Sequence, residues 1–512
     1  MATTRDEAQQ QPLHMLFLPY FALGHLIPVT DMAGLFAARG ARCTILTTPV
    51  NADIIRPAVD RANAANLHGA IVISILPFPD VGLPPGMENL KSVTPSHGAE
   101  YHVKFVQATQ LLREPFDRFL ATTRPHVDAV VSDSFFAWST DSAAAHGVPR
   151  LVFLGSSVFA RSCSETMLRN NPLQTVNCPD DPEALVLLPG LPHRVELRRS
   201  QMLDPGTRPL EWAFYQSSNA ADQRCFGEVF NSFHELEPDY VDHFHATLGR
   251  RAWLVGPVAL ATEDMAPARG RGSPSNAYSP DVAAECLQWL NTKPAGSVVY
   301  VSFGTLTSFS LAEHREIARG LDLSGKNFVW VLSGSDDDRS EWMPEGFAEL
   351  TGNNDRGFLV QGWAPQTLIP SQPALGGFLT HCGWNSVLEA VSAGVPMVTW
   401  PRYADQFYNE KLVVEVLKVG VSVGAKDYAS CMETHEVISG EVIAGSITRL
   451  MEESLESDNI RKKAEELRVK ARTAVETGGG SYNDVGRLMD ELMAGRSAVK
   501  VGEEMIRAVN GF

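Results

Sequence analysis

The densest group of reactive side chains lies in one short turn. The segment GGFLTHCGWNSVLEAVSAGVPMVTW (376–400) carries in succession His381, Cys382, Gly383, Trp384, Asn385 and Ser386. The apolar run before this turn predicts a strand, and the spacing after it predicts a helix. A helix N-terminus favours an anion, to which His381 and Ser386 can donate hydrogen bonds. A capped core helix would explain Ser386 alone but not the whole set, so the turn predicts an anion site.

Two neighbouring features suit the other parts of a nucleotide. Glu389 lies three or four residues beyond Asn385 and Ser386, on the same helix face, where a carboxylate can accept hydrogen bonds from a ribose diol. Trp363 with Gln366 offers a flat apolar face beside an amide, which suits a planar base. A tryptophan packed under a loop is the simpler interpretation of Trp363 by itself.

Other polar residues directly follow predicted strands. In open parallel sheets, ligands bind beyond the carboxyl ends of the strands, so these residues are expected at one edge of their sheets. A lone histidine beside an apolar helix is more often structural, but Asp133 at another strand end makes His25 a candidate base with an orienting carboxylate. The strand-end residues are His25, Asp133, Gly304, Thr305, Trp363, His381, Asp405 and Gln406.

The elements that must position these residues alternate between strand and helix. This βαβ rhythm predicts an α/β protein with two doubly wound domains. The predicted strands are 14–20, 43–48, 128–133 and 149–155 in the first half, and 297–304, 327–332, 357–362, 376–380, 396–400 and 420–424 in the second. A Gly-, Pro- and Ser-rich stretch separates them, so we expect a first domain over 1–256, a linker over 257–280 and a second domain over 281–485.

Composition excludes several other classes of protein. The 512 residues carry a formal net charge of -17, which argues against nucleic acid or an acidic membrane surface as partner. The seven cysteines are odd in number and form no CxxC pair, which favours a reduced cytoplasmic chain without a zinc site. The polar start is not typical of a signal peptide, and no apolar run is long enough for a membrane span.

Two motifs lack the context of the chemistry they suggest. GLDLSGKN (320–327) nearly matches a P-loop, but Asn327 replaces the Ser or Thr, and the segment follows a helix and precedes a strand. GVSVG (420–424) matches a hydrolase nucleophile motif, but its valines place Ser422 inside a strand. The acidic loop around 336–338 is better explained as solvated than as a metal site.

The segment WAPQTLIPSQPALGGFLTHCGWNSVLEAVSAGVPMVTWPRYADQ (363–406) resembles the plant secondary product glycosyltransferase box and has its 44-residue length. LPYFALGHLIPVTDMAGLFAARG (18–40), NSFHELEP (231–238) and VVYVSFGT (298–305) are also similar to segments of that family. The resemblance implies a GT-B fold, in which two Rossmann-like domains face each other across a cleft. The second domain would hold a UDP-sugar and the first an acceptor, and the last helix, over 486–512, would pack back on the first domain.

The resemblance also implies a role for each matching residue. Trp363 would stack on uracil, with Gln366 near the base and Ala364 in the same donor site, and Glu389 would hold the ribose. Thr305, His381, Asn385 and Ser386 would contact the diphosphate, and Trp384, Asp405 and Gln406 the sugar hydroxyls. His25 would be the general base, held by Asp133. Many relatives place a Thr or Ser that can touch the sugar just after the strand at 149–154, whereas this chain has Gly155, Ser156 and Ser157.

The function implied is an inverting UDP-glucose-dependent glucosyltransferase that forms a β-glucoside on a hydroxyl of a small apolar acceptor. The details GHLIP, NSFHELEP and ADQFYNEKL are most similar to the branch acting on flavonoids, other phenolics and terpenoids. First-domain loops would shape the acceptor pocket, including Met87, Phe135, Phe136 and residues near Phe153. We expect a monomer with UDP-glucose as co-substrate and with no cofactor or metal.

Three alternatives stay open at this point. The same fold could use another UDP-sugar. A nucleotide-dependent oxidoreductase would also have βαβ repeats, but PYFALGH after the first strand is not a G-x-G-x-x-G turn. A non-enzymatic binding protein on this scaffold would not need a histidine paired with Asp133.

Overall fold

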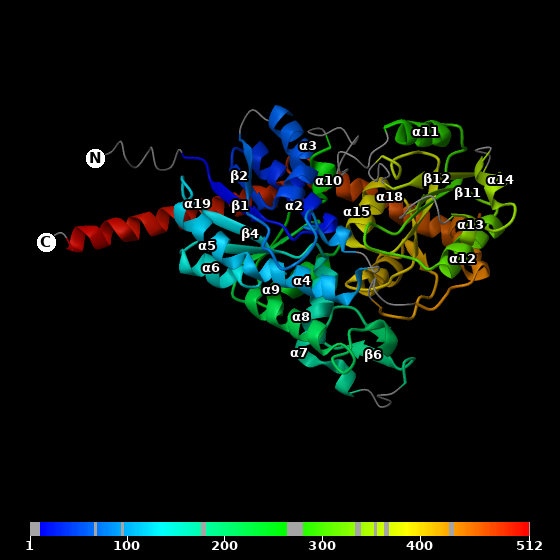
Figure 1. Ribbon diagram of the computed structural model, residues 1–512, viewed down its shortest axis with the longest axis horizontal. Coiled ribbons are helices and arrows are strands. Elements are labelled where there is room, and N and C mark those ends of the chain that lie inside the picture. Colours follow the sequence, from blue (N-terminus) through cyan, green and yellow to red (C-terminus); the bar gives the residue numbers. More distant parts are fainter. Residues whose placement is uncertain are drawn as a thin grey trace.

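The computed structural model describes residues 11–65, 69–93, 97–175, 181–263, 280–332, 339–352, 356–362, 368–429 and 435–510. Two α/β units lie side by side, the first blue to green and the second mainly yellow to orange in Figure 1. Each unit has a parallel sheet with helices on both faces. The strand positions expected from the apolar runs are confirmed, with small shifts at the ends.

The first sheet has seven strands in the order β3-β2-β1-β4-β5-β8-β9. Its strands are β1 (His14–Leu18), β2 (Arg42–Thr47), β3 (Ile71–Ile75), β4 (Ala129–Asp133), β5 (Arg150–Phe153), β8 (Gly227–Phe230) and β9 (Ala252–Leu254). Along β1, Met15 and Phe17 enter one hydrophobic core, whereas Leu16 and Leu18 enter another. This alternation arises because successive side chains of a strand point to opposite faces, and here both faces are covered.

The second sheet has six strands in the order β12-β11-β10-β13-β14-β15. They are β10 (Val298–Ser302), β11 (Asn327–Leu332), β12 (Gly357–Gln361), β13 (Leu375–Thr380), β14 (Met397–Thr399) and β15 (Gly420–Ser422). An antiparallel hairpin, β6 (Leu185–Leu188) with β7 (Val195–Arg198), stands apart from both sheets. Ser422 is the last residue of β15 rather than an interior one, and residues 423–429 after it form no helix, so the strand–turn–helix context of a hydrolase nucleophile is missing.

The helices of the first unit are α2 (Leu23–Ala38), α3 (Pro49–Ala65), α4 (Ala99–Leu111), α5 (Arg113–Thr122), α6 (Ser139–Ala145), α7 (Val158–Asn170), α8 (Pro209–Asp222), α9 (Pro238–Ala246) and α10 (Val258–Ala261). Those of the second are α11 (Pro280–Asn291), α12 (Leu311–Leu323), α13 (Arg339–Trp342), α14 (Phe347–Gly352), α15 (Trp384–Ala393), α16 (Gln406–Lys411), α17 (Gly440–Met451) and α18 (Leu455–Val475). Helix α2 begins three residues before the expected Leu26, so His25 lies in its first turn.

The chain returns to the first unit through α19 (Gly480–Asn510), the red helix in Figure 1. Val485, Leu488 and Leu492 pack in the same core as Phe17 of β1. The N–H of Leu254 in β9 donates to Asp484 Oδ2 at 2.8 Å. The last helix therefore joins the two units, and it begins slightly before the expected residue 486.

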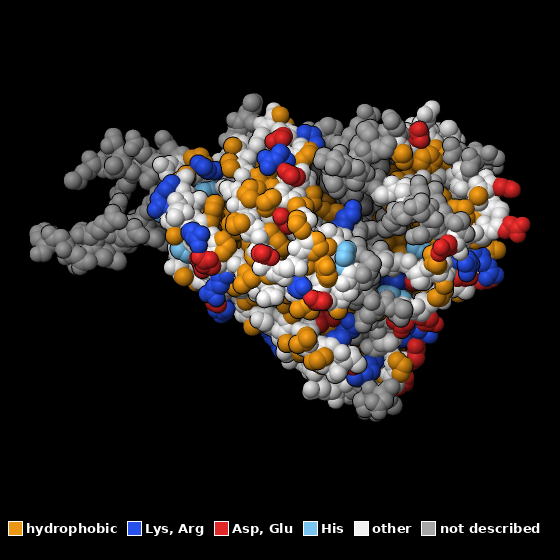
Figure 2. All heavy atoms as spheres, viewed as in Figure 1, with side chains coloured by type: hydrophobic (Ala, Val, Ile, Leu, Met, Phe, Trp, Pro, Cys, Tyr) orange, Lys and Arg blue, Asp and Glu red, His pale blue; other side chains and the backbone are white. Residues whose placement is uncertain are grey.

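Two features of the whole chain bear on the excluded classes of protein. On the face shown in Figure 2, basic and acidic side chains are interspersed. None of the helices in the described ranges combines the length and the apolar composition that a bilayer crossing requires.

Most of the expected linker, residues 264–279, lies outside the described residues, and α10 precedes it.

Candidate active site

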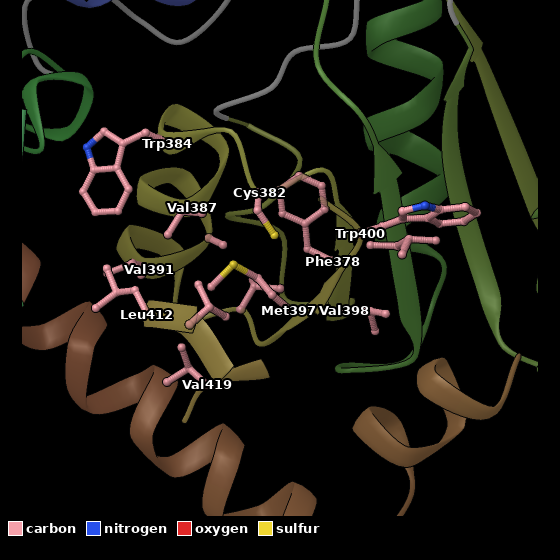
Figure 3. Close-up of a cluster of buried hydrophobic side chains, with 14 of the residues drawn as sticks. Phe378, Cys382, Trp384, Val387, Val391, Met397, Val398, Trp400, Leu412 and Val419 are labelled. Atoms are coloured by element: carbon pink, nitrogen blue, oxygen red, sulfur yellow. The ribbon is translucent and has the colours of Figure 1, made fainter. Parts of the chain in front are cut away.

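The predicted anion site is the N-terminus of α15. The N-cap of this helix is Gly383, which has no side chain to hydrogen-bond the first N–H groups, and no cap is found among the described residues. The helix packs on the second sheet through buried side chains that include Phe378, Val387 and Met397 (Figure 3). Its uncapped N–H groups are thus held on a rigid support, where they can donate to an anion.

His381 is enclosed between two glycines at the end of β13. A Cβ atom on Gly383 would come within 2.4 Å of the ring Nε2, and one on Gly304 within 2.8 Å. Gly304 also has φ +74°, which favours glycine. Burial lowers the pKa of His381 to about 4, and its Nδ1 has no hydrogen-bond partner in the described part of the chain. A neutral imidazole with an unused buried nitrogen is therefore available to hydrogen-bond a ligand.

A cavity of about 280 Å³ opens between the two units at this helix. It brings together residues that are up to 450 positions apart in the sequence, Ala22 and Arg472. Of the predicted site residues, its lining includes His25, Thr305, His381, Trp384, Asn385, Ser386, Glu389, Asp405 and Gln406. One cleft thus joins the first strand end of the chain to the predicted anion site.

His25 and Asp133 form a close pair at the edge of this cavity. His25 Nδ1 lies 2.6 Å from Asp133 Oδ2, and the backbone N–H of Phe135 donates to Asp133 Oδ1 at 3.0 Å. Burial alone would lower the pKa of His25. The charge and hydrogen bond of Asp133, together with the charge of Asp405, outweigh burial and raise that pKa above its ordinary value. The pair therefore has the geometry of a base with an orienting carboxylate.

A buried network of hydrogen bonds and an ion pair, which the sequence did not indicate, fixes the backbone around Asp133. Arg150 donates through Nη2 to the carbonyl oxygen of Asp133 at 3.3 Å and through Nε to Ser132 Oγ at 2.7 Å. Its Nη1 lies 3.0 Å from Asp222 Oδ1, and Asp222 Oδ2 accepts from Ser134 Oγ at 2.6 Å. Three consecutive residues around the carboxylate are thus fixed by one ion pair.

Asp405 is a carboxylate of the cavity that protein groups already hydrogen-bond. Its Oδ2 accepts hydrogen bonds from Ser156 Oγ at 2.8 Å and from Asn409 Nδ2 at 3.0 Å. Burial raises the pKa of Asp405, whereas these two bonds and the charge of His25 act in the opposite direction. Ser156, where the chain departs from the family pattern, therefore contacts Asp405, a residue that is predicted to bind the sugar.

The side chains of Gln406 and Arg402 already bond to protein groups close to them. The side-chain oxygen of Gln406 accepts from the backbone N–H groups of Arg402 and Tyr403, at 2.9 and 3.2 Å. Its NH2 group is therefore the part available to a ligand. Arg402 is buried, pairs with Glu313 and donates to the carbonyl oxygen of Ser308, so its charge is already compensated.

The first residues of α15 also hold the two units together. Trp384 Nε1 donates to the backbone oxygen of Asn231 at 2.7 Å, and Asn385 Nδ2 donates to the carbonyl oxygen of Gly24 at 2.8 Å. The indole thus has no free donor for a sugar hydroxyl, so Trp384 can offer a ligand its backbone N–H. Asn385 connects the anion site to the residue before His25.

Comparisons with known proteins show the family of the chain. A family model described as "UDP-glucoronosyl and UDP-glucosyl transferase" matches residues 220–449. The chain is 40% identical to anthocyanin 3'-O-beta-glucosyltransferase of Gentiana triflora, over 94% of this chain and 98% of that enzyme. It is also 40% identical to scopoletin glucosyltransferase of Nicotiana tabacum, with the same shares covered. The chain belongs to the plant UDP-glycosyltransferase family.

Solved structures agree with the fold of this UDP-glycosyltransferase. A UGT of Glycyrrhiza uralensis complexed with glycyrrhetinic acid 3-O-monoglucuronide has a TM-score of 0.88 and 37% identity, covering 98% of this chain and 99% of that one. A UGT of Medicago truncatula complexed with UDP-glucose has a TM-score of 0.77 and 26% identity, covering 94% and 98%. The GT-B fold and the resemblance stated from the sequence are thereby confirmed.

The remaining predicted site residues of the UDP-glycosyltransferase either fall outside the described residues or belong to the first unit. Trp363, Ala364 and Gln366, the predicted base site, fall outside the described residues. Phe136 and Phe153 are core side chains rather than pocket walls, because each is completely or almost completely inaccessible. Met87 is also buried, in the same core as Phe136. Phe135, which is partly exposed and lies 5.4 Å from the His25 ring between centroids, stays a candidate for contact with an acceptor.

The Asp133→Asn substitution should change the pH dependence of this UDP-glycosyltransferase. Only a neutral imidazole can accept a proton, so activity should fall as pH decreases through the raised pKa of His25. Removing the Asp133 charge leaves burial as the dominant influence and should move this acidic limb to lower pH. The maximal rate should also fall, though less than after loss of His25. The measurement is kcat/KM over about pH 5 to 9. An acidic limb that stays at the same pH or moves to higher pH would contradict the pairing.

Proposed function

We propose that the protein is an inverting UDP-glucose-dependent glucosyltransferase that glucosylates a hydroxyl of a small apolar acceptor and forms a β-glucoside. The observation that carries this proposal is that His25, paired with the buried Asp133, and the N-terminus of α15 line one cavity. A base for the acceptor and a site for a diphosphate are the two requirements of direct glycosyl transfer.

The proposed reaction is a single displacement. His25 Nε2 accepts the proton of the acceptor hydroxyl as its oxygen attacks the anomeric carbon. The bond between that carbon and the UDP oxygen breaks, and UDP leaves from the opposite face, so an α-linked donor gives a β-linked product. A positioned base contributes about 10²–10⁴-fold to such a step.

The leaving group gains negative charge, and four groups could stabilise it. The N–H groups at the start of α15 and the positive end of its dipole favour an anion, and Ser386 and the neutral His381 add donors. Thr305, beside Gly304, lines the same cavity. Glu389, on the next turn of the helix, is our candidate for the ribose hydroxyls.

The named relatives support the class of acceptor. The compounds in their printed names are an anthocyanin, scopoletin and a flavonoid, and one structure contains a triterpenoid glucuronide. We infer an apolar, largely aromatic or polycyclic acceptor, presented to His25 from the side of Phe135 and Tyr215, which are partly exposed. The buried ring of Tyr20 packs edge to face on Phe135 at a centroid distance of 5.0 Å, and Tyr215 packs on Phe135 at 6.1 Å.

The direct test is transfer itself. Purified protein is mixed with UDP-glucose and, separately, with a flavonoid, a coumarin and a triterpenoid, and the products and released UDP are quantified. We expect stoichiometric UDP and β-glucoside with at least one acceptor. UDP-sugar binding without transfer to any acceptor would favour the binding-protein alternative, and stabilisation by NADH rather than UDP would favour the oxidoreductase.

Activity is expected to persist without a divalent cation, because protein donors already face the proposed diphosphate position. The measurement is the transfer rate after treatment with EDTA, compared with the rate after adding magnesium or manganese. A rate that EDTA abolishes and either metal restores would contradict this role for α15.

Further proposals concern the chain as a whole. We propose that it acts as a monomer in the cytoplasm, with the acceptor-binding and donor-binding domains divided near residues 256 and 281. The five cysteines among the described residues are free, as a reducing compartment would maintain them.

A further inference from the structure

The segment NSFHELEP (231–238) contains no residue of the proposed chemistry, yet it lies where the two units meet. The backbone oxygen of Asn231 accepts the hydrogen bond from Trp384 Nε1, at the first residue of α15. Its side-chain oxygen accepts from the N–H of Val258 at 2.9 Å. The start of the segment thus holds the donor-site helix from the other unit.

The end of the segment holds a second helix. Glu237 is 2% exposed, and its carboxylate accepts hydrogen bonds from the N–H of Phe159 at 2.7 Å, the N–H of Val158 at 3.1 Å and Ser232 Oγ. Val158 and Phe159 are the first two residues of α7. A carboxylate supplied by a distant segment therefore satisfies the free N–H groups at this N-terminus and lies at the positive end of its dipole.

The residues just before α7 reach the sugar side of the cavity. Ser156 Oγ donates to Asp405 Oδ2 at 2.8 Å, and Ser157 Oγ donates to Asn409 Oδ1 at 3.3 Å. Asn409 in turn donates to Asp405 Oδ2 at 3.0 Å and to the carbonyl oxygen of Cys382 at 2.9 Å. A movement of the first turn of α7 would thus be transmitted to Asp405 through both of its hydrogen-bond donors.

We propose that Glu237 is a positioning residue for the donor sugar, because it fixes the turn that presses Ser156 and Ser157 against Asp405 and Asn409. This inference rests on the proposed function, in which Asp405 binds a sugar hydroxyl. Glu237 is not among the residues that line the cavity, and the hydrogen bonds that start from it lead to Asp405, so we expect its loss to affect sugar recognition more than binding of UDP alone.

The test uses Glu237→Gln. Glutamine has one acceptor oxygen instead of two, so its NH2 group would face a backbone N–H of α7, donor against donor. We expect kcat/KM for UDP-glucose to fall about tenfold and the preference for UDP-glucose over UDP-galactose to shrink by a similar factor. Affinity for UDP alone, measured by calorimetry, should stay within about twofold of wild type.

Glu165→Gln is the matched control. Glu165 lies on α7, the helix whose N-terminus Glu237 contacts, and it is 1% exposed. It accepts from Arg250 Nη1 and Gln223 Nε2, toward the other end of α7. This variant should lower the melting temperature without changing the preference between the two sugars. A merely structural role for Glu237 would make the two variants behave alike.

A double-mutant cycle with Ser156→Ala tests the route. If Glu237 acts through Ser156, the effect of Glu237→Gln on sugar preference should largely disappear in the Ser156→Ala background. Fully additive effects would overturn the inference. If Glu237→Gln did not fold, a Ser156→Ala enzyme with wild-type sugar preference would overturn it. A wild-type protein that transfers no sugar at all would instead reject the proposed function.

Discussion

The His25→Ala enzyme is expected to lose about 10²–10⁴-fold in turnover, because a phenol or alcohol is a poor nucleophile until a base accepts its proton. Its affinity for UDP should be nearly unchanged. His25 is on the first unit, whereas the proposed contacts to UDP come from α15 and its preceding turn. Turnover at saturating donor and acceptor, together with calorimetric titration of UDP, separates the two effects.

His146→Ala is a suitable control for the loss of an imidazole. His146 is exposed at the end of α6, away from the residues that line the cavity, and its loss should leave turnover unchanged. If His25→Ala kept near-normal turnover, His25 would be removed as the base. If it lost UDP binding in parallel, the Asn385–Gly24 hydrogen bond between the units would become the better explanation.

The sequence was sufficient for the parts of the molecule that have a local pattern. Apolar runs such as 297–304 and 376–380 predicted the central strands, because buried parallel strands read as continuous hydrophobic stretches. The rule that ligands bind beyond strand ends then placed His25, Thr305, His381 and Asp405 in one cleft. All four residues line that cavity.

The contacts that cross between the units had no such pattern. Ser156 and Asp405 are 249 positions apart, and Asn231 and Trp384 are 153 apart. Neither spacing produces a local signal, and a serine after a strand is equally typical of an ordinary helix cap. The buried ion pair of Arg150 with Asp222 was missed for the same reason. Aromatic residues near a site were misassigned to the pocket because sequence cannot distinguish a pocket wall from the core behind it, as Phe136 and Phe153 show.

The enzyme is expected to prefer UDP-glucose over UDP-galactose and UDP-glucuronate. Asp405 can accept from a sugar hydroxyl, and Gln406 can donate through its NH2 group, since its oxygen is bonded to two backbone N–H groups. Inverting one hydroxyl, as in galactose, should break such a bond and leave a buried polar group unpaired, at a cost of about 1–3 kcal/mol. That cost corresponds to roughly tenfold or more in kcat/KM.

Glucuronate adds a carboxylate beside Asp405, and the nearest arginine in sequence cannot easily compensate it. Arg402 is buried against Glu313 and Phe309, with its guanidinium 4.5 Å from the ring centroid of Phe309, and turning it toward the sugar would leave Glu313 buried and unpaired. One relative, soyasapogenol B glucuronide galactosyltransferase of Glycine max, is named for transfer of galactose, so the donor must be measured rather than assumed from the family. The measurement is kcat/KM for the three donors with one good acceptor, in wild type, in Asp405→Ala and in the exposed control Asp322→Ala. Equal efficiency for all three donors, or normal glucose transfer by Asp405→Ala, would mean that the sugar is recognised by other residues.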